Sequence, residues 1–334
     1  MAYKPKFTIT AHLLKMIEEI ASFREQILAA TVQVPWIPAL QKDARVKNTH
    51  ASTAIEGNPL TLQEVKILEQ GGQLLTRTNR SKQEVLNYFA ALRLIEKATE
   101  IKKITDKDLL KLHIIISTGV MDQGSSGEYR KIEVRVGHYL PPKAKEVPKL
   151  MKDLIEWWND QSQKWSPVIS SSILHYRFEA IHPFADGNGR VGRALALWEL
   201  YRRGFDTHHI FSIDETYWEN RPRYYKALDQ VRTQDDDLTG WLEYCAEVLH
   251  LTLENVLQRI DQLRLSSHKK TLVLTPKQEQ LLNLLREKKS MAPKEIWSEL
   301  NISKQGALDL LKPLIQAKLV KRIGSKKSGK YILT

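Results

Sequence analysis

The sequence predicts a mainly α-helical protein with one short extended segment and a small basic unit at its C-terminal end. Ser or Thr is followed three residues later by Glu or Asp at 61–64, 81–84 and 105–108, and apolar residues recur at helical spacing after each pair. Apolar residues that alternate with charged ones between glycines indicate the extended segment. A lysine-rich end of the chain indicates the basic unit.

The composition is that of an ordinary globular protein. The chain has 334 residues, of which 42% are hydrophobic and 27% charged, enough to build a core and two or three domains. No apolar run approaches the roughly 18 residues that cross a bilayer, and no apolar signal core follows Met1, so we expect a cytoplasmic protein without a membrane partner. The lone cysteine, Cys245, has apolar neighbours and is interpreted as a core residue.

The extended segment lies at 124–142 and is expected to form a short β-hairpin flap. Ile132 and Val134 alternate there with charged residues, and a Pro-Pro pair ends the stretch. Helical spacing predicts the elements that follow it, at 145–160, 168–180, 189–203, 213–232 and 239–265. Trp157 and Trp158 are interpreted as core residues of the first of these helices.

Residues 270–334 are predicted to fold as a separate unit after a linker at 267–270. Helix starts and strands follow one another at Thr275-Pro276, Pro293, Ser303, 319–323 and 331–333. Three helices followed by a hairpin resemble a winged helix-turn-helix module. Pro313 lies inside the third helix and is expected to kink or shorten it.

The charge of the chain is concentrated in this unit. From Lys269 onward there are 15 Lys plus Arg against 5 Asp plus Glu, whereas the preceding residues are close to neutral. One hypothesis is DNA binding through Ser303, Lys304 and Gln305 and through the turn at Lys326-Lys327. The other is docking of a protein, or packing against the helical domain.

The strongest chemical signal is the segment His182-Pro-Phe-Ala-Asp-Gly-Asn-Gly-Arg-Val-Gly-Arg193. Gly187, Asn188 and Gly189 can adopt positive φ, so that their N–H groups face one point, and the N-terminus of the following helix adds to this anion site. Arg190 and Arg193 lie three residues apart on the first turn, where both guanidinium groups can reach phosphates.

Two further residues of this segment carry chemistry. Asp186, beside a polyphosphate, is suited to hold Mg²⁺. His182 has a pKa suited to removing a hydroxyl proton near neutral pH. The segment therefore predicts a phosphoryl- or nucleotidyl-transfer site with a general base.

The same segment resembles the signature of the Fic family, H-P-F-x-[DE]-G-N-G-R-x-x-R, and the resemblance extends over roughly residues 40–250. It implies a Fic-type helical core with a flap and the transfer of AMP from ATP to a Ser, Thr or Tyr hydroxyl of a target protein. His182 would be the catalytic base, and Asp186 would hold Mg²⁺. The remaining signature residues would bind ATP phosphates, with Arg193 on the γ-phosphate: Gly187, Asn188, Gly189, Arg190, Val191, Gly192 and Arg193.

The resemblance also assigns ATP-binding roles outside the signature. The flap residues Val136, Gly137, His138 and Tyr139 would line the nucleotide pocket, and the flap edge would pair with a target segment. Tyr224 and Tyr225 resemble a Tyr pair near the adenine, and helix-face packing is the alternative. Some relatives have Asn where this chain has Arg232.

An upstream segment resembles the inhibitory motif of the family, [ST]-x-x-x-E-[GN]. It comprises Ser52, Thr53, Ala54, Ile55, Glu56 and Gly57. Glu56 follows a helix C-terminus, where a carboxylate is disfavoured unless it has a cationic partner. The resemblance implies that Glu56 pairs with Arg193, disturbs the binding of ATP and thereby inhibits the enzyme.

The sequence therefore favours an autoinhibited protein adenylyltransferase that uses ATP and Mg²⁺. The expected domains are an N-terminal helical region with the inhibitory helix at 1–110, the catalytic core at 111–266 and the winged-helix module at 270–334. Self-modification and a homodimer are further expectations. The alternatives are a nucleotide-sensing DNA-binding regulator, a toxin-antitoxin relic without transfer activity, an enzyme that removes AMP from proteins, and one that uses another nucleotide donor.

Overall fold

The computed structural model describes residues 3–31, 37–74, 77–206, 208–268, 275–316, 319–324 and 329–333. It divides into two compact units, Met1–Gln258 and Arg259–Thr334. Parts of the linker and the Lys326-Lys327 turn lie outside the described residues, so neither expectation is tested there. Among the described residues no helix has the length and apolarity of a membrane span.

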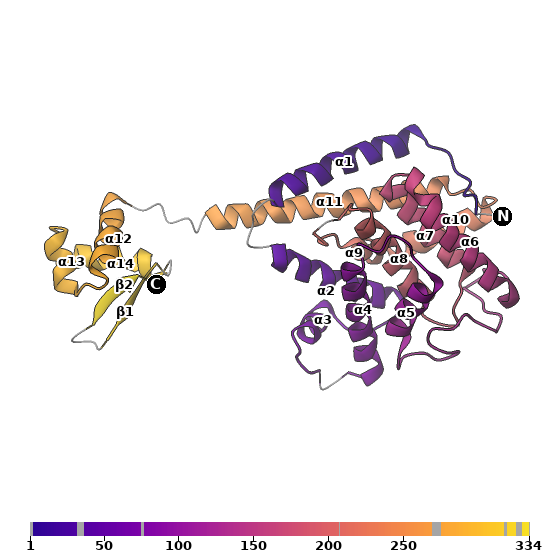
Figure 1. Cartoon of the computed structure of the whole chain (residues 1–334), viewed down its shortest axis with the longest axis horizontal. Helices are drawn as coiled ribbons and strands as arrows, with labels where there is room; N and C mark the ends of the chain where they lie inside the picture. Colours follow the sequence, from indigo (N-terminus) through magenta and orange to yellow (C-terminus); the bar gives the residue numbers. More distant parts are fainter. Residues whose placement is uncertain are drawn as a thin grey trace. The chain divides into compact units, whose positions relative to one another are not determined.

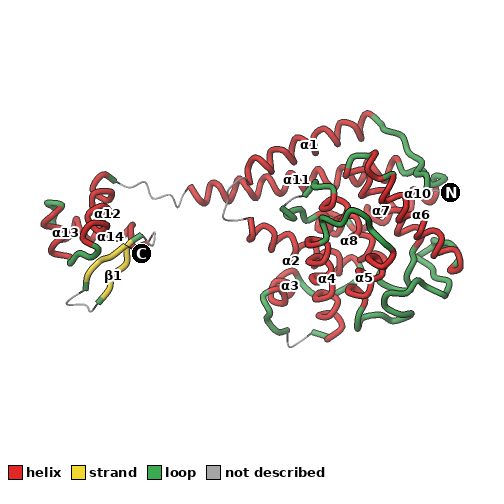
Figure 2. The backbone as a smooth tube through the Cα atoms, viewed as in Figure 1, coloured by secondary structure: helices red, strands yellow, loops and turns green. Residues whose placement is uncertain are grey.

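The mainly α fold class is confirmed (Figure 1, Figure 2). The helices of the first unit are α1 Ala11–Thr31, α2 Ile37–Ile55, α3 Leu62–Glu69, α4 Asn79–Lys97, α5 Asp106–Ser117, α6 Val147–Asp160, α7 Pro167–Ile181, α8 Asn188–Arg202, α9 Ile213–Glu219, α10 Arg221–Thr233 and α11 Thr239–His268, whose last residues belong to the second unit. Short 3₁₀ turns at Ala144–Glu146 and Ser162–Lys164 flank α6.

The helices α7 and α8 form the centre of the first unit. Both are buried on almost every face, and α8 buries the charged residues Arg190, Arg193 and Glu199 together with its apolar ones. Helix α2 packs against α9 and α4, α4 and α5 pack against each other and against α8, and α6 packs against α7. Because α7 ends and α8 begins at the signature segment, the surrounding helices hold both ends of that segment in place.

The long helices α1 and α11 run side by side (Figure 1). Glu19 of α1 pairs with His250 of α11 at 3.2 Å, and the ring of Phe23 lies 4.9 Å from the same imidazole. Trp157, Trp158 and Cys245 are buried, which confirms their interpretation as core residues.

Several expected element boundaries need correction. Thr61 and Thr105 have the predicted capping boxes, but α4 begins two residues before Ser81, and its cap is Thr78, whose hydroxyl accepts the Ser81 N–H. The helix expected at 213–232 is two helices, because the backbone turns at Asn220 (φ −131°) and Pro222 occupies the first turn of α10.

The flap also has less regular β structure than the expected two-stranded hairpin. In 124–142 one antiparallel bridge joins Val136 and Tyr139, whose N–H and C=O groups exchange hydrogen bonds of 3.0 and 2.9 Å. The rest is loop (Figure 2). Gly137 lies at the turn with φ +57°, and the remaining alternating residues have no strand to pair with in the described part of the chain.

The second unit contains α12 Pro276–Lys288, α13 Pro293–Glu299 and α14 Lys304–Gln316, followed by β1 Val320–Ile323 and β2 Lys330–Leu333. The strands are antiparallel, with Arg322 opposite Tyr331. Leu281, Ile296, Leu311 and Tyr331 belong to one buried cluster. Helix α14 continues three residues beyond Pro313, so the proline does not end it; the burial of Leu311 and Leu314 on either side stabilises this turn.

Candidate active site

The connection between α7 and α8 places the signature residues at one helix N-terminus. His182 ends α7 in the left-handed conformation (φ +50°, ψ +61°), and Gly187 precedes α8 with φ +82°. Of the three residues expected at positive φ, only Gly187 adopts it; Asn188 and Gly189 already belong to the helix. The anion site is therefore the first turn of α8, where the N–H groups have no acceptors within the helix.

The Asn188 side chain closes the loop rather than facing an open site. Its Oδ1 accepts the Phe184 N–H at 2.9 Å, and its Nδ2 donates to the Phe184 carbonyl at 2.8 Å. The residue is buried, and both polar atoms of its side chain bond to the loop backbone, while its role in phosphate binding stays a prediction. Val191 is fully buried as well and packs in the core.

Asp186 lies beside the anion site with its side chain 28% exposed. Its Oδ1 accepts the Gly187 N–H at 2.5 Å and lies 3.4 Å from Arg190 Nη2. The structure has no cluster of three or more His, Cys, Asp or Glu side chains within the described ranges that could enclose a metal. A single carboxylate nevertheless fits Mg²⁺, which takes its other ligands from phosphates and water.

His182 is in the neutral protonation state that a general base requires. Its side chain is 17% exposed, and burial lowers the pKa of His182 to about 4. The imidazole is therefore neutral at pH 7, with a ring nitrogen able to accept a proton.

Arg193 is fully enclosed and is held by the predicted inhibitory segment. Its Nε donates to Ser52 Oγ at 2.8 Å, and its Nη2 donates to the Ser52 carbonyl at 2.9 Å and to Glu56 Oε1 at 2.7 Å. Burial opposes the charged form of Glu56, yet the Arg193 guanidinium keeps the pKa of Glu56 below its usual value. The structure thus brings together Ser52, Glu56 and Arg193, as the motif resemblance implies.

The Glu56 carboxylate also rests directly on the first turn of α8. A Cβ atom built at Gly189 would lie 2.2 Å from Glu56 Oε1, so glycine at this position is what lets the carboxylate approach. The segment is shaped by α2, which buries Thr53, Ala54 and Ile55, and by Gly57, whose φ of +95° ends the turn. The Glu56 carboxylate therefore lies beside Gly189, one of the residues of the predicted anion site.

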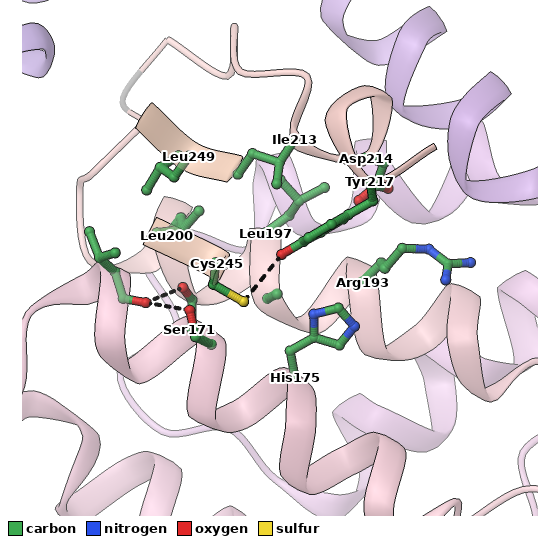
Figure 3. A pocket seen from close by; sticks show the side chains of 13 residues that line it. Ser171, His175, Arg193, Leu197, Leu200, Ile213, Asp214, Tyr217, Cys245 and Leu249 are labelled. Atoms are coloured by element: carbon green, nitrogen blue, oxygen red, sulfur yellow. Dashed lines mark hydrogen bonds between the residues drawn. The ribbon is translucent and has the colours of Figure 1, made fainter. Parts of the chain in front are cut away.

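Arg193 is one of the residues that line a small cavity of about 20 Å³ (Figure 3). His175, Asp214, Tyr217 and Cys245 are among its lining residues. This volume suits one water molecule and no larger ligand. Burial raises the pKa of Asp214 to about 6, while nearby Arg193 opposes this shift.

The flap residues lie where α7 and α10 can hold them. Tyr139 donates a hydrogen bond of 2.8 Å to the Ala180 carbonyl, and the Arg232 guanidinium stacks 3.9 Å from the Tyr139 ring centre. Arg232, which departs from the family pattern, thus contacts the flap. Gly137 and His138 are exposed, and Val136 is partly exposed.

The two tyrosines of the expected adenine pair differ in their surroundings. Tyr224 is buried, and its hydroxyl lies 3.1 Å from His175 Nε2, so it is a core residue as the packing alternative proposes. Tyr225 is 40% exposed and donates a hydrogen bond of 3.3 Å to the Ile55 carbonyl. Only Tyr225 is accessible near the inhibitory segment.

Sequence reasoning missed Arg130, which joins the flap to the signature segment. Its side chain is fully buried and donates hydrogen bonds to the carbonyls of His182 (2.8 Å), Ile132 (3.1 Å) and Pro142 (2.5 Å). Because all these acceptors are backbone atoms, no side-chain pattern could have indicated them. His113 was missed for the same reason; it contacts the Asp186 carbonyl at 3.1 Å and stacks on Phe184.

A comparison with family models identifies this region. Residues 103–200, which include the whole signature segment, match the Fic/DOC family.

Curated relatives extend the similarity. Protein adenylyltransferase Fic of Culex quinquefasciatus is 29% identical over 262 residues, which is 77% of this chain and 50% of the relative. Protein adenylyltransferase fic-1 of Caenorhabditis elegans is 32% identical over 201 residues, 59% of this chain and 38% of the relative. The chain thus spans about half the length, or less, of these relatives.

Solved structures support the same fold. A Fic family protein from Desulfovibrio desulfuricans G20 is 27% identical, with a TM-score of 0.71 over 99% of this chain and 98% of that one. The crystallised part of C. elegans Fic-1 is 25% identical, with a TM-score of 0.65 over 78% of this chain and 74% of that one.

Proposed function

The chain is a member of the Fic/DOC family, and from this premise we propose that it is a protein adenylyltransferase. It would transfer AMP from ATP to a hydroxyl of a target protein, and the first target to test is the chain itself. The observation that carries the proposal is the neutral His182 base beside the open-ended first turn of α8, flanked by Arg190 and Arg193. These are the groups that a nucleotidyl transfer needs.

The step can be written with these residues alone. His182 accepts the proton of the target hydroxyl, and the hydroxyl oxygen attacks the α-phosphorus of ATP. The bond from that phosphorus to the bridging oxygen breaks, and pyrophosphate leaves. The N–H groups at the start of α8, with Arg190 and Arg193, stabilise the phosphate charge, and positioning supplies the rest of the acceleration.

Asp186 is the residue that would hold Mg²⁺. When bound, the ion would supply neutralisation of the phosphate charge. The residue's own contribution is a carboxylate fixed by the Gly187 N–H and Arg190 next to the anion site.

The inhibitory role of Glu56 belongs to the same proposal. Its carboxylate is paired with the Arg193 guanidinium and lies beside Gly189, in the space that phosphate oxygens would need. ATP would have to displace it to bind productively. Removal of AMP from proteins is a second candidate, because the 35% exposed Glu56 carboxylate lies at the same site and could act on water.

The test is intact-mass spectrometry after incubation with ATP and Mg²⁺. We expect an AMP adduct on Glu56→Gly and a smaller amount of the same adduct on Glu56→Gln, whose side chain keeps the shape of glutamate. We expect no adduct on the double variant that carries Glu56→Gly and His182→Ala. Equal adducts on wild type and Glu56→Gly would refute inhibition. The absence of an adduct from every variant, together with loss of AMP from a pre-modified sample, would favour the second candidate.

For the second unit we propose contact with an anionic partner, with duplex DNA as the first to test. A groove of about 630 Å³ lies between α13, α14 and the hairpin, and Lys294, Lys304 and Lys330 line it. None of the described residues that line it is acidic. Leu308, which also lines it, is 47% exposed and supports the competing hypothesis of protein docking.

Salt dependence separates these hypotheses. Phosphate contacts make the logarithm of DNA affinity fall steeply and linearly with the logarithm of salt concentration. We expect such a slope for wild type and a reduced slope for Lys304→Gln. No binding of duplex DNA at low salt would exclude DNA and leave protein docking.

A further inference from the structure

A second glutamate lies beside the catalytic base and has no role in the mechanism above. Glu179 is on α7, three residues before His182, and its side chain is 8% exposed. Its Oε2 lies 3.8 Å from His182 Nδ1, and this ring nitrogen has no hydrogen-bond partner among the described residues. Its Oε1 is buried and has no hydrogen-bond partner within the described residues. An unpaired buried carboxylate oxygen is costly, so its presence next to the base calls for an explanation.

Helix α8 leaves room for this carboxylate. A Cβ atom at Gly192 would lie 2.4 Å from Glu179 Oε1, so only glycine permits the present position. Gly192 occupies one of the unrestricted positions of the family signature, and the signature therefore does not explain it. Gly189 and Gly192 thus leave room on α8 for two different glutamates, Glu56 and Glu179.

The charges around Glu179 come from four elements. His182 follows it on α7, Arg193 faces it from α8, Glu56 from the turn after α2 and Arg232 from α10. Burial raises the pKa of Glu179 to about 7, Arg193 lowers it, and Glu56 raises it further. The carboxyl group therefore changes charge close to neutral pH.

We propose that Glu179 is a positioning residue that orients the His182 ring and stabilises the imidazolium formed when His182 accepts the target proton. The proton stays on His182 during the attack on the α-phosphorus, and Glu179 neither gains nor loses a proton in this step. The carboxylate complements the new positive charge across 3.8 Å, through electrostatic attraction and without a hydrogen bond in this conformation. This inference rests on the proposed function, because it assigns a partner to the same base.

The proposal predicts how the rate depends on pH. Only the ionised carboxylate stabilises the imidazolium, so the rate should rise with pH as Glu179 loses its proton, near 7 in wild type and at a lower pH in a variant that lacks Glu56, which raises this pKa. With a neutral amide in place of the carboxylate, the rise of the rate that Glu179 causes should vanish. The rate should then fall only at acidic pH, where His182, whose pKa is about 4, becomes protonated.

Kinetics in the Glu56→Gly background test this prediction. Glu179→Gln should lower the rate of self-modification at saturating ATP by about 10- to 100-fold, the range typical of a lost charge partner, with the KM for ATP changed less than about two-fold. Gly192→Ala, which displaces the carboxylate without removing its charge, should act in the same direction. Glu199→Gln, at a buried glutamate of the same helix pair, serves as the control that leaves the rate unchanged. A rate loss for Glu179→Gln with an unaltered pH profile would overturn the proposal.

A second readout is independent of AMP transfer. In NMR titrations of the full chain without nucleotide, the His182 ring resonances should shift near pH 7 in wild type as Glu179 ionises, and this step should disappear in Glu179→Gln. If Glu56→Gly transfers no AMP but the coupling is observed, the proposed function fails and the Glu179–His182 pair stands. If no step near pH 7 is observed in wild type, the pair itself is refuted.

Discussion

A glutamate pairs with arginine at each end of α8, but the two pairs differ in burial and in the number of hydrogen bonds that the glutamate accepts. At the N-terminal end, Glu56 makes one contact of 2.7 Å with Arg193, and its side chain is 35% exposed. At the C-terminal end, Glu199 is fully buried and is bonded by Trp158 Nε1 at 2.6 Å and Ser170 Oγ at 2.7 Å, besides Arg202 at 3.0 Å and Arg203 at 3.2 Å.

The difference distinguishes a contact that can be exchanged from one that cannot. Removing one partner of a buried, fully bonded group leaves the others unpaired, which is costly. A half-exposed carboxylate with a single partner can leave into water, and an incoming phosphate can replace it. The contact at Arg193 therefore has the character of a replaceable ligand, and the contact at Glu199 that of a structural joint.

The largest expected effect is on stability at the buried end. Glu199→Ala should lower the free energy of unfolding by about 3–5 kcal/mol, because Trp158 and both guanidinium groups lose their acceptor. Glu56→Ala should cost about 1 kcal/mol or less. Urea unfolding of both variants measures this. Equal losses would show that the two contacts do not differ as described.

Ser52→Ala should have the next largest effect. Ser52 Oγ accepts from Arg193 Nε at 2.8 Å, and both residues are buried, so its loss leaves a charged donor unpaired and should cost about 1.5–3 kcal/mol. In that case Ser52 would hold Arg193 permanently, and Glu56 would be the partner that a phosphate can replace. Thermal unfolding of Ser52→Ala beside Glu56→Ala tests the division, and a smaller loss for Ser52→Ala would reverse it.

Sequence patterns predict the glutamate contact at the N-terminal end of α8 but not the one at its C-terminal end. The contact between Glu56 and Arg193 was predicted because both residues lie in short motifs that resemble a family signature. Glu199 and Glu179 belong to no motif, and their partners are set by how α6, α7 and α8 pack. The helices themselves were largely predictable from capping and spacing, whereas Asn188, Tyr224 and Arg130 required knowledge of the buried backbone atoms they contact.

A double-mutant cycle measures how tightly Glu56 rests on α8. Gly189→Ala should cost about 1–2 kcal/mol in wild type, because the new methyl group would overlap Glu56 Oε1. In the Glu56→Ala background the same change should be neutral or stabilising by about 0.5–1 kcal/mol, since alanine favours a helix over glycine. An equal cost in both backgrounds would mean that Glu56 does not occupy this position in solution.

The smallest expected effect is that of pH on the exchangeable contact. Because Arg193 lowers the pKa of Glu56 in the folded state, the contact contributes fully above the ordinary pKa of glutamate, near 4.3, and is lost as pH falls through the lowered value. In a Glu179→Gln background, which removes the coupled group that titrates near 7, the difference in unfolding free energy between Glu56 and Glu56→Gln, about 1 kcal/mol or less, should be constant from pH 8 to about 5 and decline below that. Urea unfolding at pH 7, 5 and 3.5 would show this, and a difference that grew on acidification would contradict the ion pair. A contact indifferent to pH in the neutral range leaves displacement by nucleotide or by a bound protein as the means of releasing Arg193.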